Sequence, residues 1–263
     1  MARIAVAATA PFGADVLERL AARHEIAFVL TRPDAPSGRG RALAPSPAKV
    51  AAERLGLHVL QPPQPEIEDV DTVVVVAYGL LIPSSLLERA LWLNVHPSLL
   101  PRWRGAAPVE RAIMAGDATT GVTIHRTVAE LDAGPIAAQG AFPIEEEDDA
   151  GAVFEHAAEV AADLLEGVLA EGAPRFEPQP EEGVTYAEKI TPKDRELDLR
   201  RPAEELERTV RALSPHIGAR SRLHGRDVIV WRARVEGGEF VPVEVQPAGK
   251  RRMTYEEFLR GLR

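Results

Sequence analysis

The feature that most constrains the fold of this 263-residue chain is an unbroken apolar run, Thr-Val-Val-Val-Val-Ala, at residues 72–77. A strand that is apolar at every position is buried on both faces, which is typical of the centre of a parallel sheet with helices on either side. Strand-like runs at residues 3–8 and 26–30 precede it, and segments with helical spacing alternate with them. This alternation predicts an α/β fold with a doubly wound, mostly parallel sheet.

The sequence also predicts two domains joined by a linker. Apolar side chains recur every three or four positions over residues 154–168, which predicts the last helix of a first domain at residues 1–171. Residues 172–193 are rich in Pro and Glu and are typical of a linker. Beyond them, strand-like segments separated by His-Gly and Gly-Gly turn signals predict a small, barrel-like β domain at residues 194–263.

The charges are divided unevenly along the chain. The whole sequence carries a formal net charge of −9, yet residues 183–263 hold 17 Lys and Arg against 13 Asp and Glu, a net charge of +4. This asymmetry permits the C-terminal region to meet a polyanion, although a solvated charged surface explains it as well.

Several classes of site are excluded by what the sequence lacks. It has no cysteine, which excludes disulfides, thiolate metal ligands and Cys nucleophiles. The glycines of the loop at residues 31–45 lack the spacing of a dinucleotide fingerprint, so we expect neither NAD nor FAD. The seven histidines show no metal-binding spacing, so we expect no metal. The apolar run at residues 1–8 is too short for a signal peptide or a membrane span, and we expect a cytoplasmic protein.

Two polar side chains, Asn94 and His96, share one side of a predicted strand end. The run Leu91–Leu93 predicts a buried strand, and residues two apart on a strand point to the same face. Pro97 then ends the ladder of hydrogen bonds. A lone Asn-x-His is equally well interpreted as a turn with a satisfied core histidine. Asp132, in the small-residue turn Leu-Asp-Ala-Gly, favours a reactive site because it adds a carboxylate.

An amide, an imidazole and a carboxylate together suit attack on a carbonyl carbon. Asn94 can donate to a developing oxyanion, His96 can donate to the same oxygen or shuttle a proton, and a nearby Asp132 favours the imidazolium form. No Ser or Cys stands where a nucleophile is needed, and Ser98 lacks the surrounding G-x-S-x-G elbow. We therefore expect the nucleophile to come from the substrate, most simply as an amine, without a covalent enzyme intermediate.

These residues lie in motifs that resemble a known family. Asn-x-His-x-Ser-Leu-Leu-Pro at residues 94–101 and Leu-Asp-x-Gly at 131–134 resemble the 10-formyltetrahydrofolate-dependent formyltransferases. Three further motifs resemble the methionyl-tRNA formyltransferases within that family: Gly-Arg-Gly-Arg at 38–41, Arg-Trp-Arg-Gly-Ala-Ala-Pro at 102–108 and Gln-Pro-Ala-Gly-Lys at 246–250.

The resemblance implies a fold, a reaction and residue roles. It implies a Rossmann-like formyltransferase domain in which Asn94, His96 and Asp132 form the catalytic trio around the formyl group. The folate contacts that it implies are Ser98, Leu99, Leu100, Pro101, Val76, Ala77, Tyr78 and Gly79. The tRNA contacts that it implies are Arg32, Arg39, Arg41 and Lys250. The implied reaction moves the formyl group of 10-formyltetrahydrofolate to the α-amine of methionyl initiator tRNA, for translation initiation.

One departure from the family lies in the C-terminal domain. A block of roughly 30 residues, long enough for several strands, is missing before Phe240. We therefore expect a shortened, OB-like barrel. Separately, we expect the protein to be a monomer. Two alternatives stay open. A formyltransferase for a sugar nucleotide or another small amine would not need the loop arginines, and a tRNA-binding module with a vestigial pocket would not need the intact trio.

Overall fold

The computed structural model describes residues 2–37, 42–62 and 70–262, and it divides into two compact units. The first unit consists of residues 1–104, 121–141 and 155–185. The second consists of residues 105–120, 142–154 and 186–263. Two short segments inside the predicted first domain thus group with the C-terminal residues.

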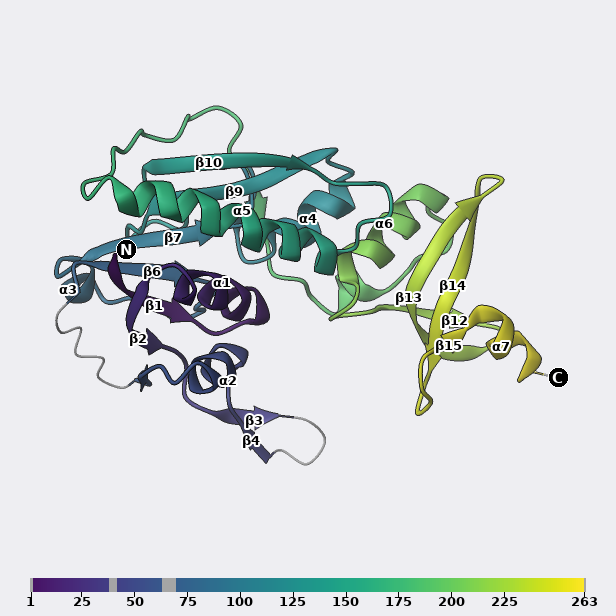
Figure 1. Ribbon diagram of the computed structural model, residues 1–263. Helices are drawn as coiled ribbons and strands as arrows, with labels where there is room; N and C mark the ends of the chain where they lie inside the picture. The colour runs from purple at the N-terminus through teal and green to yellow at the C-terminus, as the bar shows by residue number, and fades with distance from the viewer. Residues whose placement is uncertain (1, 38–41, 63–69, 263) are drawn as a thin grey trace. The chain divides into compact units, whose positions relative to one another are not determined.

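A seven-stranded sheet is the centre of the first unit (Figure 1). Its strands, in sheet order, are β10 (Ile136–Pro143), β9 (Thr119–Arg126), β7 (Leu91–His96), β6 (Thr72–Val76), β1 (Arg3–Ala8), β2 (Glu25–Leu30) and β5 (Val59–Leu60). The five strands from β7 to β5 run parallel, whereas β9 runs antiparallel to β7. The prediction of a mostly parallel sheet is confirmed.

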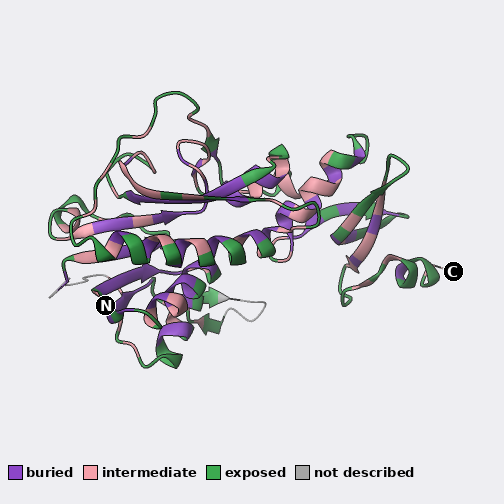
Figure 2. Cartoon of the chain, turned by 45° about the horizontal axis from the view of Figure 1, so that its top comes forward, coloured by how far each residue is buried: buried purple, intermediate pink, exposed green. Residues whose placement is uncertain are grey.

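Helices on both faces explain why β6 is apolar throughout. On one face, α1 (Pro11–Ala21) and α5 (Ala150–Ala170) lie side by side (Figure 1), and Arg23, two residues beyond α1, pairs with Asp163 of α5 at 2.7 Å. On the other face, α3 (Ser84–Leu87) packs against a cluster that includes Trp92. Between these layers β6 is buried along most of its length (Figure 2).

Local capping signals set the ends of the shorter helices. Ser46 accepts a hydrogen bond from the backbone N–H of Lys49 at 3.0 Å and so caps α2 (Pro47–Arg54). Helix α4 (Pro108–Ala115) begins at a proline and ends at Gly116, whose φ of 76° lies in the left-handed region that glycine adopts without strain. Both helix starts carry a local sequence signal, a capping serine before α2 and a proline at the start of each helix. The loop between β2 and α2 instead contains an unpredicted hairpin of β3 (Ala35–Ser37) and β4 (Ala42–Ala44).

The second unit contains a four-stranded antiparallel sheet flanked by helices. Its strands, in order, are β12 (Ala219–Leu223), β13 (Arg226–Glu236), β14 (Glu239–Pro247) and β15 (Met253–Thr254). Helices α6 (Ala203–Leu213) and α7 (Tyr255–Arg260) pack on an apolar cluster with these strands, and Thr254 and Glu257 form a capping box at the start of α7. A tight Gly237-Gly238 turn joins β13 to β14 at the point where the sequence lacks the block of the related enzymes. The sheet is consistent with the predicted small β domain.

The segment predicted as a linker makes specific contacts. Its β11 (Tyr186–Ala187) pairs with β8 (Arg104–Gly105), Glu177 pairs with Ile136 of β10, and a short 3-10 turn follows at Lys193–Arg195. Residues 172–193 are therefore ordered against the rest of the chain over much of their length. In the described part of the chain, no helix is both long and apolar enough to cross a membrane.

Candidate active site

The three residues predicted to carry the chemistry meet at the carboxyl end of β7. The Asn94 amide nitrogen, Nδ2, lies 3.3 Å from Asp132 Oδ1, and His96 Nδ1 lies 3.7 Å from Asp132 Oδ2. The side chain of His96 is 5% exposed and that of Asp132 is 13% exposed. The structure thus brings the three predicted side chains together in one place.

The local fold explains this convergence. Asn94 and His96 are two residues apart on β7, so both side chains leave the same face of the sheet. Asp132 follows β9, the antiparallel neighbour of β7, and the backbone there turns through a φ of 47° at Asp132. Two residues later, a Cβ on Gly134 would lie 1.7 Å from the carbonyl oxygen of Arg126, so only glycine fits. The turn thereby brings the carboxylate back over the end of β7.

The orientation of the His96 ring is set by the backbone. Its Nε2 lies 2.8 Å from the carbonyl oxygen of Trp103. Because a carbonyl oxygen only accepts, Nε2 carries a proton and donates it there. This leaves Nδ1 on the side of Asp132 as the ring atom that can gain or lose a proton during a reaction.

A second histidine, His125, belongs to the site, and the sequence analysis missed it. It lies opposite Asn94 in the β7–β9 register, and its Nε2 is 3.0 Å from Asn94 Nδ2. Burial, together with the neighbouring His96, lowers the pKa of His125 to about 4. His125 is therefore neutral near pH 7. Side chains alternate between the two faces of the strand at residues 121–127, so the sequence places His125 on one face. Only the pairing of β9 with β7 shows that the Asn94 side chain lies beside it.

Two further missed residues hold the Asp132 turn in place. Gln179, from the segment predicted as a linker, donates from Nε2 to the carbonyl oxygens of Asp132 at 2.7 Å and Gly134 at 2.8 Å. The guanidinium of Arg104 donates to Gln179 Oε1 from Nε at 3.0 Å and from Nη2 at 2.7 Å. No local sequence signal marks Gln179, because its partners lie more than 40 residues away.

The predicted folate contacts lie on the two loops that follow β6 and β7. Ser98 is fully buried and donates to the carbonyl oxygen of Arg102 at 2.7 Å, so its hydroxyl shapes the turn. Ala77 and Gly79 follow β6 with positive φ angles, and the carbonyl oxygen of Tyr78 accepts from Thr9 Oγ1 at 2.7 Å. The remaining predicted contacts are Leu99, Leu100 and Pro101, in the loop after β7, and Val76 at the end of β6.

The predicted tRNA contacts are spread over the chain. Arg32 is exposed and follows β2, and its carbonyl oxygen accepts from Gln61 Nε2 at 2.7 Å. Lys250 is exposed between β14 and β15 in the second unit. Arg39 and Arg41 lie outside the described residues.

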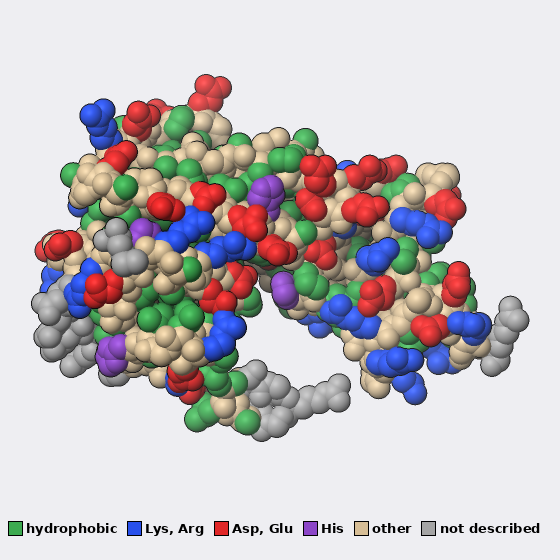
Figure 3. Space-filling view, in the orientation of Figure 1, with side chains coloured by type: hydrophobic (Ala, Val, Ile, Leu, Met, Phe, Trp, Pro, Cys, Tyr) green, Lys and Arg blue, Asp and Glu red, His purple; other side chains and the backbone are tan. Residues whose placement is uncertain are grey.

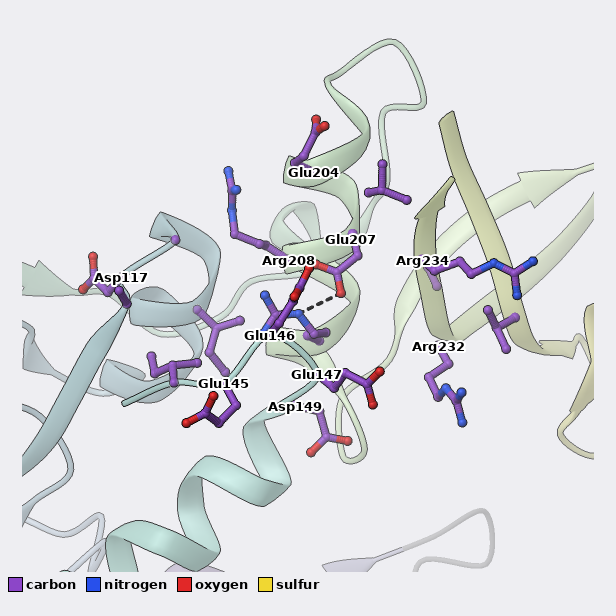
Figure 4. Close-up of a pocket in the computed structure, with 18 of the residues that line it drawn as sticks. Asp117, Glu145, Glu146, Glu147, Asp149, Glu204, Glu207, Arg208, Arg232 and Arg234 are labelled. Atoms are coloured by element: carbon purple, nitrogen blue, oxygen red, sulfur yellow. Dashed lines mark hydrogen bonds and ion pairs between the residues drawn. The ribbon is translucent and has the colours of Figure 1, made fainter. Parts of the chain in front are cut away.

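A cavity of about 870 Å³ lies within the second unit (Figure 4). Acidic side chains of the 145–149 loop line one part of its wall, while Arg232 and Arg234 of β13 line another. Arg211 of α6 also lines it, but its guanidinium is bound to Glu207 at 2.7 Å. The cavity is therefore lined by charges of both signs, and Asn94, His96 and Asp132 are not among its lining residues. Among the residues described, no cluster of His, Asp and Glu could hold a metal ion.

Comparison with known proteins identifies the family. The formyl transferase family model matches residues 2–169, and the model of the formyl transferase C-terminal domain matches residues 189–242. A methionyl-tRNA formyltransferase of Paracoccus denitrificans is 41% identical, over 99% of this chain and 97% of its own length. One from Halorhodospira halophila is 46% identical, over 90% of this chain and 81% of its own length.

Solved structures share the fold at low sequence identity. A methionyl-tRNA formyltransferase from Clostridium thermocellum superposes with a TM-score of 0.67 at 14% identity, over 94% of this chain and 98% of its own. A HypX variant from Aquifex aeolicus gives a TM-score of 0.70 at 19% identity, over 100% of this chain and 47% of its own. The sequence matches decide the assignment: the chain belongs to the formyl transferase family, among the methionyl-tRNA formyltransferases.

Proposed function

We propose that the chain transfers the formyl group of 10-formyltetrahydrofolate to the α-amine of methionine on initiator tRNA. The observation that carries this proposal is the convergence of Asn94, His96 and Asp132 at one strand end. These groups fit a formyl carbon, because they supply an amide donor, an imidazole and a carboxylate. A free α-amine titrates near 7.7–8.0 and an esterified one lower, so the attacking amine is partly neutral without a strong base.

The residues of the trio have distinct tasks in this proposal. An N–H of Asn94 stabilises the oxygen of the formyl group as its carbon is attacked. His96 moves protons at Nδ1, since its Nε2 is held by the Trp103 carbonyl. The nucleophile loses one proton, and the departing folate nitrogen gains one. Asp132 faces His96 Nδ1 and stabilises the ring while it is charged.

The loops after β6 and β7 are the proposed place for the folate. Both follow carboxyl ends of neighbouring parallel strands, which is where open α/β sheets bind their ligands. Leu81, just beyond Gly79, is 94% exposed, and Leu80 is 39% exposed. Apolar side chains at this edge suit a flat heteroaromatic ring, and a structural neighbour, HypX from Aquifex aeolicus, was solved in complex with tetrahydrofolic acid.

Exposed basic side chains are the proposed contacts for tRNA. The predicted set is Arg32, Arg39, Arg41 and Lys250. Further exposed arginines lie on the sheet of the second unit, where Figure 3 shows Lys and Arg side chains at the surface. They include Arg220, Arg222, Arg226, Arg232 and Arg234. Contacts of this kind bind phosphates regardless of sequence and supply affinity that falls with salt.

The experiment is an acceptor comparison with the purified full-length chain. It is incubated with 10-formyltetrahydrofolate and, in separate reactions, methionyl initiator tRNA, free methionine and an amino-sugar nucleotide. We expect formylation of the charged tRNA with a kcat/KM at least about a hundredfold above that for either small amine, because neither small amine carries the row of backbone phosphates that the basic side chains would contact. Faster transfer to the amino-sugar nucleotide would refute the assigned acceptor and leave formyl transfer itself in place.

A matched pair of variants tests the site. His96→Ala removes the proton-carrying ring, whereas His58→Ala removes an exposed histidine that precedes β5. General acid–base groups contribute about 10²–10⁴-fold, so we expect His96→Ala to lose that much turnover and His58→Ala to match the wild type. Near-normal turnover in a folded His96→Ala protein would exclude the proposed mechanism.

A further inference from the structure

We infer that His125 is a positioning residue that fixes which end of the Asn94 amide faces the reacting carbon. The inference rests on the proposed formyl transfer and adds a fourth side chain to its machinery. It is carried by a chain of hydrogen bonds that runs from the backbone of β9, through the imidazole, to the amide on β7.

The first step is the tautomer of His125. Its Nδ1 lies 3.1 Å from the carbonyl oxygen of Arg126. A carbonyl oxygen only accepts, so Nδ1 is the protonated nitrogen of the ring. The ring is 2% exposed and neutral near pH 7, because burial lowers its pKa to about 4. In this neutral tautomer Nε2 carries a lone pair and can only accept.

The second step is the amide of Asn94. Its partner at Nε2 of His125 must be a donor, which places Nδ2 rather than Oδ1 at the 3.0 Å contact. The other N–H of the same nitrogen points to Asp132 Oδ1 at 3.3 Å. A flipped amide would set its oxygen against a lone pair on one side and a carboxylate on the other. Both contacts therefore select the same rotamer.

The third step concerns the reaction itself. The contact with Asp132 is the longer of the two, so its N–H is the one released most easily to an oxyanion. Once it is released, His125 is the remaining partner that keeps the amide nitrogen in place. A donor fixed before the charge develops needs no reorganisation, which is the condition for effective oxyanion stabilisation.

The strand pairing explains why His125 can do this from a different element. Asn94 and His125 are direct partners in the antiparallel β7–β9 ladder, and side chains of such pairs lie close together on one face. The contact thus depends on two packed strands and not on a loop. The amide is held between two paired strands of the central sheet.

The test compares two substitutions at one position. His125→Leu keeps an apolar side chain of similar bulk but removes the acceptor, whereas His125→Gln keeps an acceptor oxygen within reach of Asn94. A hydrogen bond of this kind contributes about one factor of ten, so we expect His125→Leu to lower kcat about tenfold with the folate KM unchanged. We expect His125→Gln to keep kcat within about threefold of the wild type.

A spectroscopic measurement follows the hydrogen bonds directly. Nitrogen-15 NMR of histidine-labelled protein reports which ring nitrogen carries the proton, and the His125→Leu variant assigns the signal. We expect His125 to be protonated at Nδ1 and bare at Nε2 at pH 7. His58→Leu is the matched control, since it removes an exposed histidine outside the site.

Each outcome decides the inference. A folded His125→Leu protein with normal kcat, or a proton found on Nε2, overturns it. Equal losses in the Leu and Gln variants, together with equally lowered melting temperatures, also overturn it, because they show a packing role only. An inactive wild-type protein would instead refute the proposed function, and the ring tautomer would still be measurable.

Discussion

Replacing Gln179 by Ala tests whether the segment that was predicted as a linker holds the catalytic turn. Gln179 donates to the carbonyl oxygens of Asp132 and Gly134, and Arg104 donates twice to Gln179. Two hydrogen bonds at about 1 kcal/mol each hold the turn. Against them stands the left-handed backbone at Asp132, with a φ of 47°, which costs a non-glycine residue about 1–2 kcal/mol. Without Gln179 the observed turn therefore loses its advantage over competing conformations.

The expected result is a loss of activity with modest loss of stability. About 2 kcal/mol converts to roughly a 30-fold decrease in kcat for formyl transfer. Binding of tetrahydrofolate, measured by calorimetry, should change little, because Gln179 contacts the Asp132 turn. Gln246→Ala is the control, since Gln246 also bridges a side chain and a carbonyl oxygen, in the second unit. Wild-type kcat in a folded Gln179→Ala protein would refute the idea that this side chain positions Asp132.

Three further predictions concern pH, packing and salt. Burial lowers the pKa of His125 from 6.5 to about 4. Between these two pH values the unfolded chain therefore takes up a proton on this histidine that the native state does not. The free energy of unfolding should thus fall by about 3 kcal/mol between pH 6.5 and 4 through this group, and His125→Leu should lack that part of the slope in urea titrations. Gly134→Ala forces a Cβ against the Arg126 carbonyl oxygen and should destabilise the protein by about 3 kcal/mol, and an unchanged melting temperature would contradict this. Arg32→Ala and Lys250→Ala should each lower the slope of log affinity for tRNA against log salt by about 0.7 to 0.9 if the side chain contacts a phosphate, and no change would remove that residue from the interface.

Local signals predicted much of the fold. The unbroken apolar run indicated the buried strand β6, and Pro108 with Gly116 marked both ends of α4. Ser46 marked the start of α2 through its cap. These features depend on interactions within a few residues, so a single sequence carries them.

The part of the site that depends on distant pairing was not predictable in this way. Asn94, His96 and Asp132 were found because their motifs are local and resemble those of a family. The contact of His125 with Asn94 depends on the register of β7 against β9, which no composition or spacing reveals. Gln179 was interpreted as linker because Pro and Glu surround it, although its amide reaches the Asp132 turn 47 residues away.

The central claim is that Asn94, His96 and Asp132 work as one catalytic unit, and a double-mutant cycle tests it most directly. The measurement is kcat/KM for formyl transfer to methionyl initiator tRNA by the wild type, His96→Ala, Asp132→Ala and the double variant. Residues that act as a unit show grossly non-additive effects. We predict that the double variant is no slower than His96→Ala alone, within about threefold. Losses that multiply in the double variant would show that the two side chains act independently, and would contradict the account.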